Sequence, residues 1–213
     1  VQPFIVGEKD NYRFGHLHTV LSLKTYGGEI GKQLGSREVT YDGEEMKNIY
    51  SMIKEMIDKG YLGDNLLSTD AQQEGSYFQQ GKAAFQYNGS WGASGIQNSD
   101  CELYKEQKIG VTRFPAVTEE YAKVDMGGGN DSYFVSKLNK SDDEVAASLV
   151  LLKYISSKDF CAGLMEVNPN TMAIKTDFVS DNYLLNDIQD IMADTEETRS
   201  DLQNYDSQAH MIN

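Results

Sequence analysis

The most informative stretch of this chain reads Phe78-Gln79-Gln80-Gly81-Lys82-Ala83-Ala84-Phe85-Gln86-Tyr87-Asn88-Gly89-Ser90-Trp91. We expect Gly81 to end a preceding helix, because glycine is common just past a helix C-terminus. The apolar run 83–87 predicts a buried strand, and Asn88-Gly89 predicts a tight turn. The only tryptophan of the sequence, Trp91, follows directly. The stretch therefore predicts a helix, a strand and a turn that presents an aromatic side chain.

The sequence before this stretch predicts one strand and three helices. Residues 3–6 are apolar enough for a short strand, residues 12–23 predict a loop that passes into a helix, and residues 70–80 predict another helix. The clearest helix begins at Asp42, the predicted N-cap, with Glu45 at capping-box spacing. It is predicted to end at Gly60 and to carry one apolar stripe: Met46, Ile49, Tyr50, Ile53, Met56 and Ile57.

The sequence after this stretch continues the alternation of strands and helices. Residues 108–114 predict a strand, and a glycine-rich loop at 126–131 precedes a second predicted strand at 132–136. Ser141 and Glu144 form a capping box for a helix that runs to residue 155 and is apolar nearly all round, so it is predicted to be buried. Residues 158–167 predict a short helix, and the tail from residue 180 is helical in pattern as far as Glu196. This alternation predicts an α/β fold.

The composition describes a globular and acidic chain. Its 213 residues correspond to about 1.4 domains, and 33 acidic against 19 basic residues give a net charge of −14. That charge argues against nucleic acid and against an anionic membrane surface as partners. The sequence has no apolar run of transmembrane length, and its first residues lack the basic start of a signal peptide. Cys101 and Cys161 predict two buried free thiols; a single bridge is the alternative.

Motifs for common catalytic and metal sites are absent from the sequence. His16 and His18 would share one face of a strand, but no third metal ligand is near, so we expect no metal site. A glycosidase needs two carboxylates across a cleft. Helix starts or loops are expected at the adjacent acidic pairs of this chain: Glu44-Glu45, Glu119-Glu120, Asp142-Asp143 and Glu196-Glu197. These positions favour a role in helix capping or on the solvated surface over a catalytic role.

Aromatic residues in polar surroundings are the best candidates for a binding site. Tyr12 and Phe14 flank Arg13, and Trp91 follows the Asn88-Gly89-Ser90 turn. An aromatic plane can cover the apolar C–H face of a sugar while nearby polar groups pair with its hydroxyls. A core role for Trp91 explains the composition equally well.

Residues 78–91 closely resemble the F-x-x-G-K-A-A-M-x-x-x-G-x-W signature of the family 1 extracellular solute-binding proteins of ABC importers, with Phe85 in place of the common Met. Four further segments resemble the family in the family's order: 7–16, 108–115, 127–137 and 168–170. They extend the likeness from Val1 to about Phe178. The fourth segment lacks the family's usual glycine.

The resemblance implies a lobe of the periplasmic-binding-protein-like type II α/β fold, with three α/β/α layers, in a fragment of a two-lobe protein. It implies that residues 1–125 form the second, C-terminal-type lobe, that residues 126–180 cross to the first lobe, and that residues 181–213 form an incomplete helical return.

It also implies a function without catalysis. The whole protein would capture a sugar or oligosaccharide between two lobes and deliver it to the membrane permease of an ABC importer. It would act as a monomer, need no cofactor, and be exported, either to the periplasm or as a membrane-anchored lipoprotein. A carbohydrate hydrolase that uses paired carboxylates is the alternative. The implied ligand-binding residues are Trp91, Tyr12, His16, Asn130 and Asp131, with Arg13 and Asn88 as additional candidates.

Overall fold

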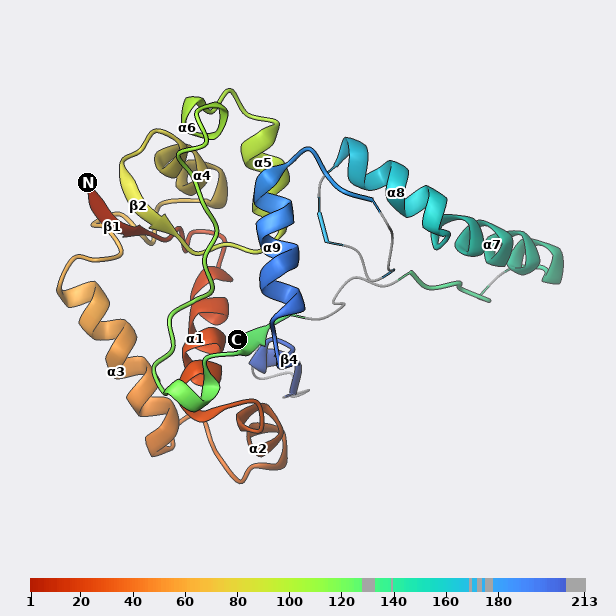
Figure 1. Cartoon of the computed structure of the whole chain (residues 1–213). Coiled ribbons are helices and arrows are strands. Elements are labelled where there is room, and N and C mark those ends of the chain that lie inside the picture. The colour runs from red at the N-terminus through yellow and green to blue at the C-terminus, as the bar shows by residue number, and fades with distance from the viewer. Residues whose placement is uncertain (128–132, 139, 169, 172–173, 175–177, 206–213) are drawn as a thin grey trace.

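The computed structural model describes residues 1–213 except 128–132, 139, 169, 172–173, 175–177 and 206–213. Helices dominate the described chain, and its strands are short (Figure 1). The elements in order are β1 (Gln2–Ile5), α1 (Arg13–Tyr26), α2 (Ile30–Ser36), α3 (Glu44–Asp58), α4 (Ala71–Gln79), β2 (Ala83–Gln86), α5 (Trp91–Gln97), α6 (Glu102–Lys105), η1 (Glu119–Tyr121), β3 (Val124–Met126), α7 (Asp142–Ile155), α8 (Lys158–Val167), α9 (Tyr183–Ala193), β4 (Glu197–Arg199) and η2 (Leu202–Tyr205).

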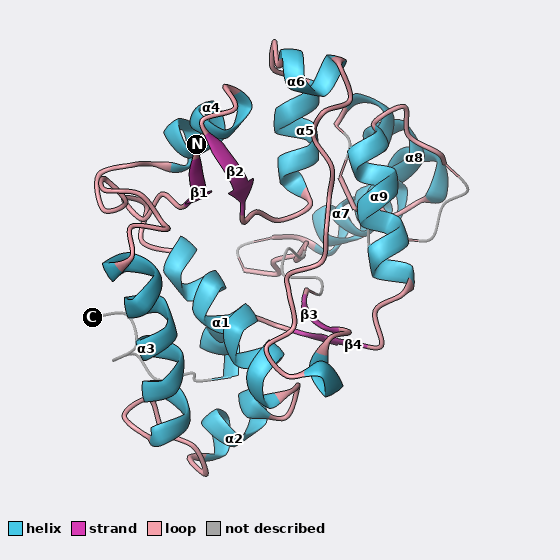
Figure 2. Cartoon of the chain, turned by 60° about the vertical axis from the view of Figure 1, so that its left-hand side comes forward, coloured by secondary structure: helices cyan, strands magenta, loops and turns pink. Residues whose placement is uncertain are grey.

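The described strands form two small parallel pairs, which Figure 2 shows among the helices. β1 pairs with β2 with Phe4 opposite Phe85, and β3 pairs with β4 with Val124 opposite Glu197. Parallel neighbours need a crossover connection, usually helical. Helices α1 to α4 supply it between β1 and β2, so the predicted α/β class is confirmed.

Buried apolar side chains of the described chain gather in three clusters around α1 and α9. One cluster joins α1, α3 and the loop after β1, and a second joins α1, α2, β3 and η2. The third joins α5, α8 and α9 and contains Cys101 and Met165. Cys101 and Cys161 are both buried and free, as predicted.

One of the two capping predictions is confirmed: Ser141 caps α7 in a reciprocal capping box with Glu144. The structure adds a capping box that was not predicted, between Asp70 and Gln73 at the start of α4. The other prediction is wrong: α3 starts one residue later, with Gly43 at the N-cap and no side-chain cap. The carboxylate of Asp42 instead accepts a hydrogen bond from the Thr40 hydroxyl at 2.7 Å.

Two predicted strands are not strands. Residues 108–114 are irregular, and so is the described part of 132–136. Among the described strands none pairs with residues 108–114, and side-chain contacts hold the segment instead. Ile109 is buried in the third cluster, and the Arg113 guanidinium donates to Asp125, Asp194 and the Ile191 carbonyl. The predicted strand over 83–87 is present, but it is only partly buried, since Ala84 and Phe85 are exposed.

Helix α7 has the predicted bounds but not the predicted burial. It projects with α8 away from the other helices (Figure 1), and no residue of α7 is buried. Its apolar side chains lie largely in solvent, with Val150 at 72% exposure. Helices α2, α5 and α6 and strands β3 and β4 were not predicted from the sequence. No helix in the described part of the chain has the length and apolar character needed to cross a membrane.

Candidate functional site

Three aromatic side chains form a row where α1 and α5 begin. Tyr12 is the N-cap of α1 and His16 lies one turn later, so both fall on one face of the helix. Their ring centroids are 5.4 Å apart, and the His16 ring lies 6.2 Å from that of Trp91. Trp91 is 47% exposed, so it is not a core anchor. Tyr12, His16 and Trp91 together form the aromatic row.

A buried ion pair lies behind the aromatic row. The Arg13 side chain is 3% exposed, and its Nε lies 3.3 Å from Oε2 of the fully buried Glu74 on α4. Arg13 Nη1 donates to Asn88 Oδ1 at 3.0 Å, and its guanidinium lies over the Tyr12 ring at 5.0 Å. Arg13 and Asn88 thus lie with the aromatic row, and their mutual hydrogen bond favours a supporting role.

Glu74 ties this ion pair to strand β2 and to the segment after β1. It accepts hydrogen bonds from the Gly7 backbone at 2.7 Å and from the Gln86 side chain at 2.8 Å. Burial raises the pKa of Glu74, while the Gln86 hydrogen bond and the Arg13 charge oppose that rise. A charge this deeply buried is tolerated only when it is paired and hydrogen-bonded. Glu74 therefore fixes α1 and the segment that leads to Trp91 in one arrangement.

The turn before Trp91 is held from a second side. Ser90 Oγ donates to Asn170 Oδ1 at 2.8 Å and lies 2.9 Å from Thr171 Oγ1. Residues 170–171 therefore reach the aromatic row from a distant part of the sequence, and the sequence carried no local signal for this contact. Asn130 and Asp131, also predicted for the site, lie outside the described residues.

His16 is set apart from ordinary surface histidines by its surroundings. Its Nε2 lies 3.5 Å from Oδ2 of Asp201, which is itself buried. Burial lowers the pKa of His16, the nearby Asp201 carboxylate opposes this, and the Arg13 charge adds to it. The imidazole is therefore neutral at pH 7.

The described residues do not assemble a catalytic or metal constellation around the row. Glu44-Glu45 and Asp142-Asp143 lie in the first turns of α3 and α7, and Glu119-Glu120 in η1, as the capping interpretation predicts. The fourth acidic pair differs from the prediction, because Glu197 begins strand β4. His18 is on the buried side of α1, stacked on Tyr50 at 5.2 Å. Among the described residues no cluster of His, Cys, Asp and Glu is able to hold a metal ion.

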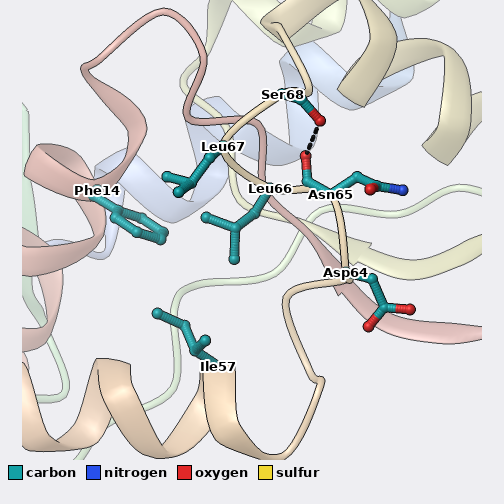
Figure 3. A pocket seen from close by; sticks show the side chains of 7 residues that line it. All are labelled: Phe14, Ile57, Asp64, Asn65, Leu66, Leu67 and Ser68. Atoms are coloured by element: carbon teal, nitrogen blue, oxygen red, sulfur yellow. Dashed lines mark hydrogen bonds between the residues drawn. The ribbon is translucent and has the colours of Figure 1, made fainter.

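A separate apolar pocket of about 490 Å³ lies beside the start of α1 (Figure 3). Its lining shares no residue with the aromatic row and consists of Phe14, Ile57, Asp64, Asn65, Leu66, Leu67 and Ser68. Its apolar lining offers few groups to a hydroxyl-rich ligand.

Comparison with solved structures identifies the fold, whereas no family model and no curated protein matches the chain. A solved chitin oligosaccharide binding protein superposes with a TM-score of 0.86 at 21% identity, covering 96% of this chain and 51% of that one. A Streptococcus pneumoniae solute-binding protein, solved with the blood group A-trisaccharide, gives 0.69 at 20% identity, covering 98% and 51%. A family 1 extracellular solute-binding protein from Bifidobacterium longum subsp. infantis gives 0.62 at 18% identity, covering 92% and 50%.

The chain therefore has the fold of sugar-binding solute-binding proteins, as the sequence resemblance implied. It spans about half the length of these solved structures. These neighbours are binding proteins rather than enzymes.

Proposed function

We propose that this chain carries one wall of a sugar-binding site in the substrate-binding component of an ABC importer. The observation that carries the proposal is the aromatic row. Its rings lie at a helix start, with Trp91 half exposed, on a support fixed by the buried Arg13–Glu74 pair. A fixed, solvent-facing aromatic surface is suited to bind the apolar face of a sugar ring.

In this proposal each side chain has a distinct part. Trp91 stacks on a sugar ring, and Tyr12 and His16 contact it from α1. Asn130 and Asp131 accept hydrogen bonds from its hydroxyls. Arg13 and Asn88 hold the support, since they bond to each other and Arg13 is buried.

The same proposal gives residues 126–180 a role in the whole protein. The apolar side chains of α7 are exposed, and a second lobe packed on them would remove that surface from water. Residues 1–125 and 181–213 would then form the other lobe. A sugar bound between the lobes would favour the closed state, which the permease recognises. The whole protein would work outside the cytoplasm as a monomer, in the periplasm or on a lipid anchor.

Isothermal titration calorimetry with chitin oligosaccharides, xylo-oligosaccharides and galactose tests the proposal. We expect saturable binding of one sugar class to the 213-residue chain, and a loss of about tenfold or more in affinity for Trp91→Ala. Tyr61→Ala, which truncates an exposed aromatic outside the row, is the matched control and should bind as the wild type does.

A reducing-sugar release assay run beside the calorimetry separates binding from hydrolysis. We expect no turnover. Turnover that disappears when one carboxylate is replaced would overturn the proposal in favour of a hydrolase. Equal affinities for the wild type and Trp91→Ala would remove the aromatic row from the site.

A further inference from the structure

The aromatic row has a buried carboxylate behind it that comes from the far end of the described chain. Asp201 lies between β4 and η2 and is 4% exposed. Its Oδ1 accepts a hydrogen bond from the Thr19 hydroxyl at 2.7 Å, and Oδ2 accepts from the Gln203 side chain at 3.1 Å. Oδ2 also lies 3.5 Å from Nε2 of His16. Oδ1 also accepts from the Gln203 backbone N–H at 3.3 Å. Three hydrogen bonds therefore fix the carboxylate while it faces the imidazole.

The groups that surround the imidazole are few and differ in charge. Arg13, on α1, is positively charged. Tyr12, the N-cap of α1, makes an edge contact with the imidazole. From α5, Trp91 brings a neutral ring. From the segment after β2, the Tyr87 hydroxyl donates to the His16 carbonyl at 3.4 Å and stays neutral, because burial raises its pKa. Among the described residues, Asp201 is the carboxylate in contact with the ring.

We infer that Asp201 is a positioning residue for ligand binding: it holds His16 in the neutral tautomer with its hydrogen on Nε2, which leaves Nδ1 free to accept a hydrogen bond from a sugar hydroxyl. This inference rests on the proposed function. An ionised carboxylate only accepts hydrogen bonds, so the ring nitrogen that faces it carries the hydrogen. In the described part of the chain nothing hydrogen-bonds Nδ1, and the ring lies next to the exposed Trp91.

This arrangement makes ligand binding depend on pH. Burial and the Arg13 charge favour the neutral ring, and Asp201 partly opposes them, so His16 protonates only below its ordinary pKa of 6.5. Protonation converts Nδ1 from an acceptor to a donor. Sugar affinity should therefore fall as the pH decreases through the lowered pKa of His16, because the ring gains its second hydrogen.

Histidine NMR of the 213-residue chain tests the positioning role without a ligand. The His16 signals are assigned with His16→Gln and His18→Gln. We expect the wild-type ring to show the Nε2–H tautomer, and Asp201→Asn to shift it toward Nδ1–H and lower its titration midpoint, because the opposing charge is lost. Asp194→Asn makes the same change at an exposed carboxylate bound to Arg113 and Lys123, and it should leave His16 unchanged.

A second variant covers the case in which Asp201→Asn does not fold. Thr19→Val removes the hydroxyl that fixes Oδ1 and should move the tautomer in the same direction by a smaller amount. An unchanged His16 tautomer in both variants, or in the one that folds, would overturn the inference.

Calorimetry then separates this inference from the proposed function. If both hold, Asp201→Asn lowers sugar affinity several-fold and moves the remaining acid decline to lower pH. A tautomer that shifts in Asp201→Asn while sugar affinity does not change would overturn the ligand role of Asp201. If the wild type binds no sugar, the proposed function and the ligand role of Asp201 are both overturned. A tautomer shift in Asp201→Asn would then show only that Asp201 sets the His16 tautomer.

Discussion

At the scale of single residues, the position of Trp91 depends on the absence of a side chain at Gly89. A Cβ built on Gly89 meets the six-membered ring of the Trp91 indole at Cζ3, Cη2 and Cε3. The Asn88 side chain also accepts a hydrogen bond from the Gly89 backbone at 2.9 Å, so the turn has little freedom to move aside. The glycine thus sets where the indole plane lies.

Gly89→Ala should therefore displace the indole and weaken sugar binding about tenfold, with little change in the free energy of unfolding. The reason is that Trp91 is half exposed, so moving it costs few core contacts. Gly95→Ala on α5 is the control, because nothing lies within 4 Å of the added Cβ. It should stabilise the helix by about 0.5–1 kcal/mol and leave binding unchanged. Equal affinities in calorimetry for the two variants would contradict this prediction.

At the scale of elements, buried charges hold the helices and strands together. Glu74 joins α4 to the segment after β1, to β2 and to α1. Asp125 on β3 joins α1 and the segment before η1, because it contacts the fully buried Lys24 at 2.7 Å and Arg113 at 3.0 Å. Both carboxylates thus connect segments that are far apart in the sequence.

Glu74→Ala should destabilise the chain by about 3–5 kcal/mol, because it leaves the Arg13 guanidinium buried without its carboxylate. Urea unfolding at pH 7 measures the loss. Glu44→Ala removes an exposed glutamate from the first turn of α3 and should cost less than about 1 kcal/mol. A loss for Glu74→Ala no larger than for Glu44→Ala would show that the buried pair does not support the site.

Asp125 predicts an acid-dependent part of the stability. Burial would raise its pKa, but hydrogen bonds from Lys24 and Thr195, together with the positive charges of Lys24 and Arg113, hold the pKa below its ordinary value of 3.8. A carboxyl whose folded pKa is depressed contributes stability above its unfolded pKa and loses it as the pH falls through the folded pKa. Unfolding free energies measured from pH 5 to pH 2 should therefore fall more steeply below pH 3.8 in the wild type than in Asp125→Asn. Parallel curves would contradict this.

The sequence patterns that were predicted well are local ones. The capping box at Ser141 needs only residues three positions apart, and the local pattern of residues 158–167 was enough to predict α8. Tyr12, His16 and Trp91, which the family resemblance implied for the site, lie together in the structure. The predicted strand at 108–114 was wrong because a strand needs a neighbour, and the sequence does not say whether one is there. Glu74 and Asp201 support the site through contacts across 67 and 182 positions, which no spacing rule covers.

At the scale of the whole molecule, α7 combines a well-formed N-terminus with an unburied apolar surface. Ser141 and Glu144 form a reciprocal capping box that satisfies two backbone N–H groups at the start of the helix. The exposed apolar residues are Leu149, Val150, Leu151 and Tyr154. A helix that is apolar all round is typical of a buried position, and this surface is the one that the proposed second lobe would cover.

Replacing part of this surface should change association but not folding. In the 213-residue chain, the triple variant Leu149→Gln, Val150→Lys, Leu151→Gln keeps good helix formers on α7 and removes exposed apolar area. We expect its urea midpoint to stay at the wild-type value, because these side chains are exposed. We expect its binding of a hydrophobic dye and its concentration-dependent light scattering to decrease, because the apolar surface is smaller.

Leu184→Gln is the matched control, since Leu184 is a leucine on α9 that is 2% exposed in the third cluster. It should lower the free energy of unfolding by about 2–5 kcal/mol, because it removes a buried apolar side chain and places an amide in the core. A triple variant that is destabilised as much as Leu184→Gln would show that α7 is already covered in the isolated chain. The second lobe would then have no open surface on α7 to occupy, and residues 126–180 would not serve as the crossing segment.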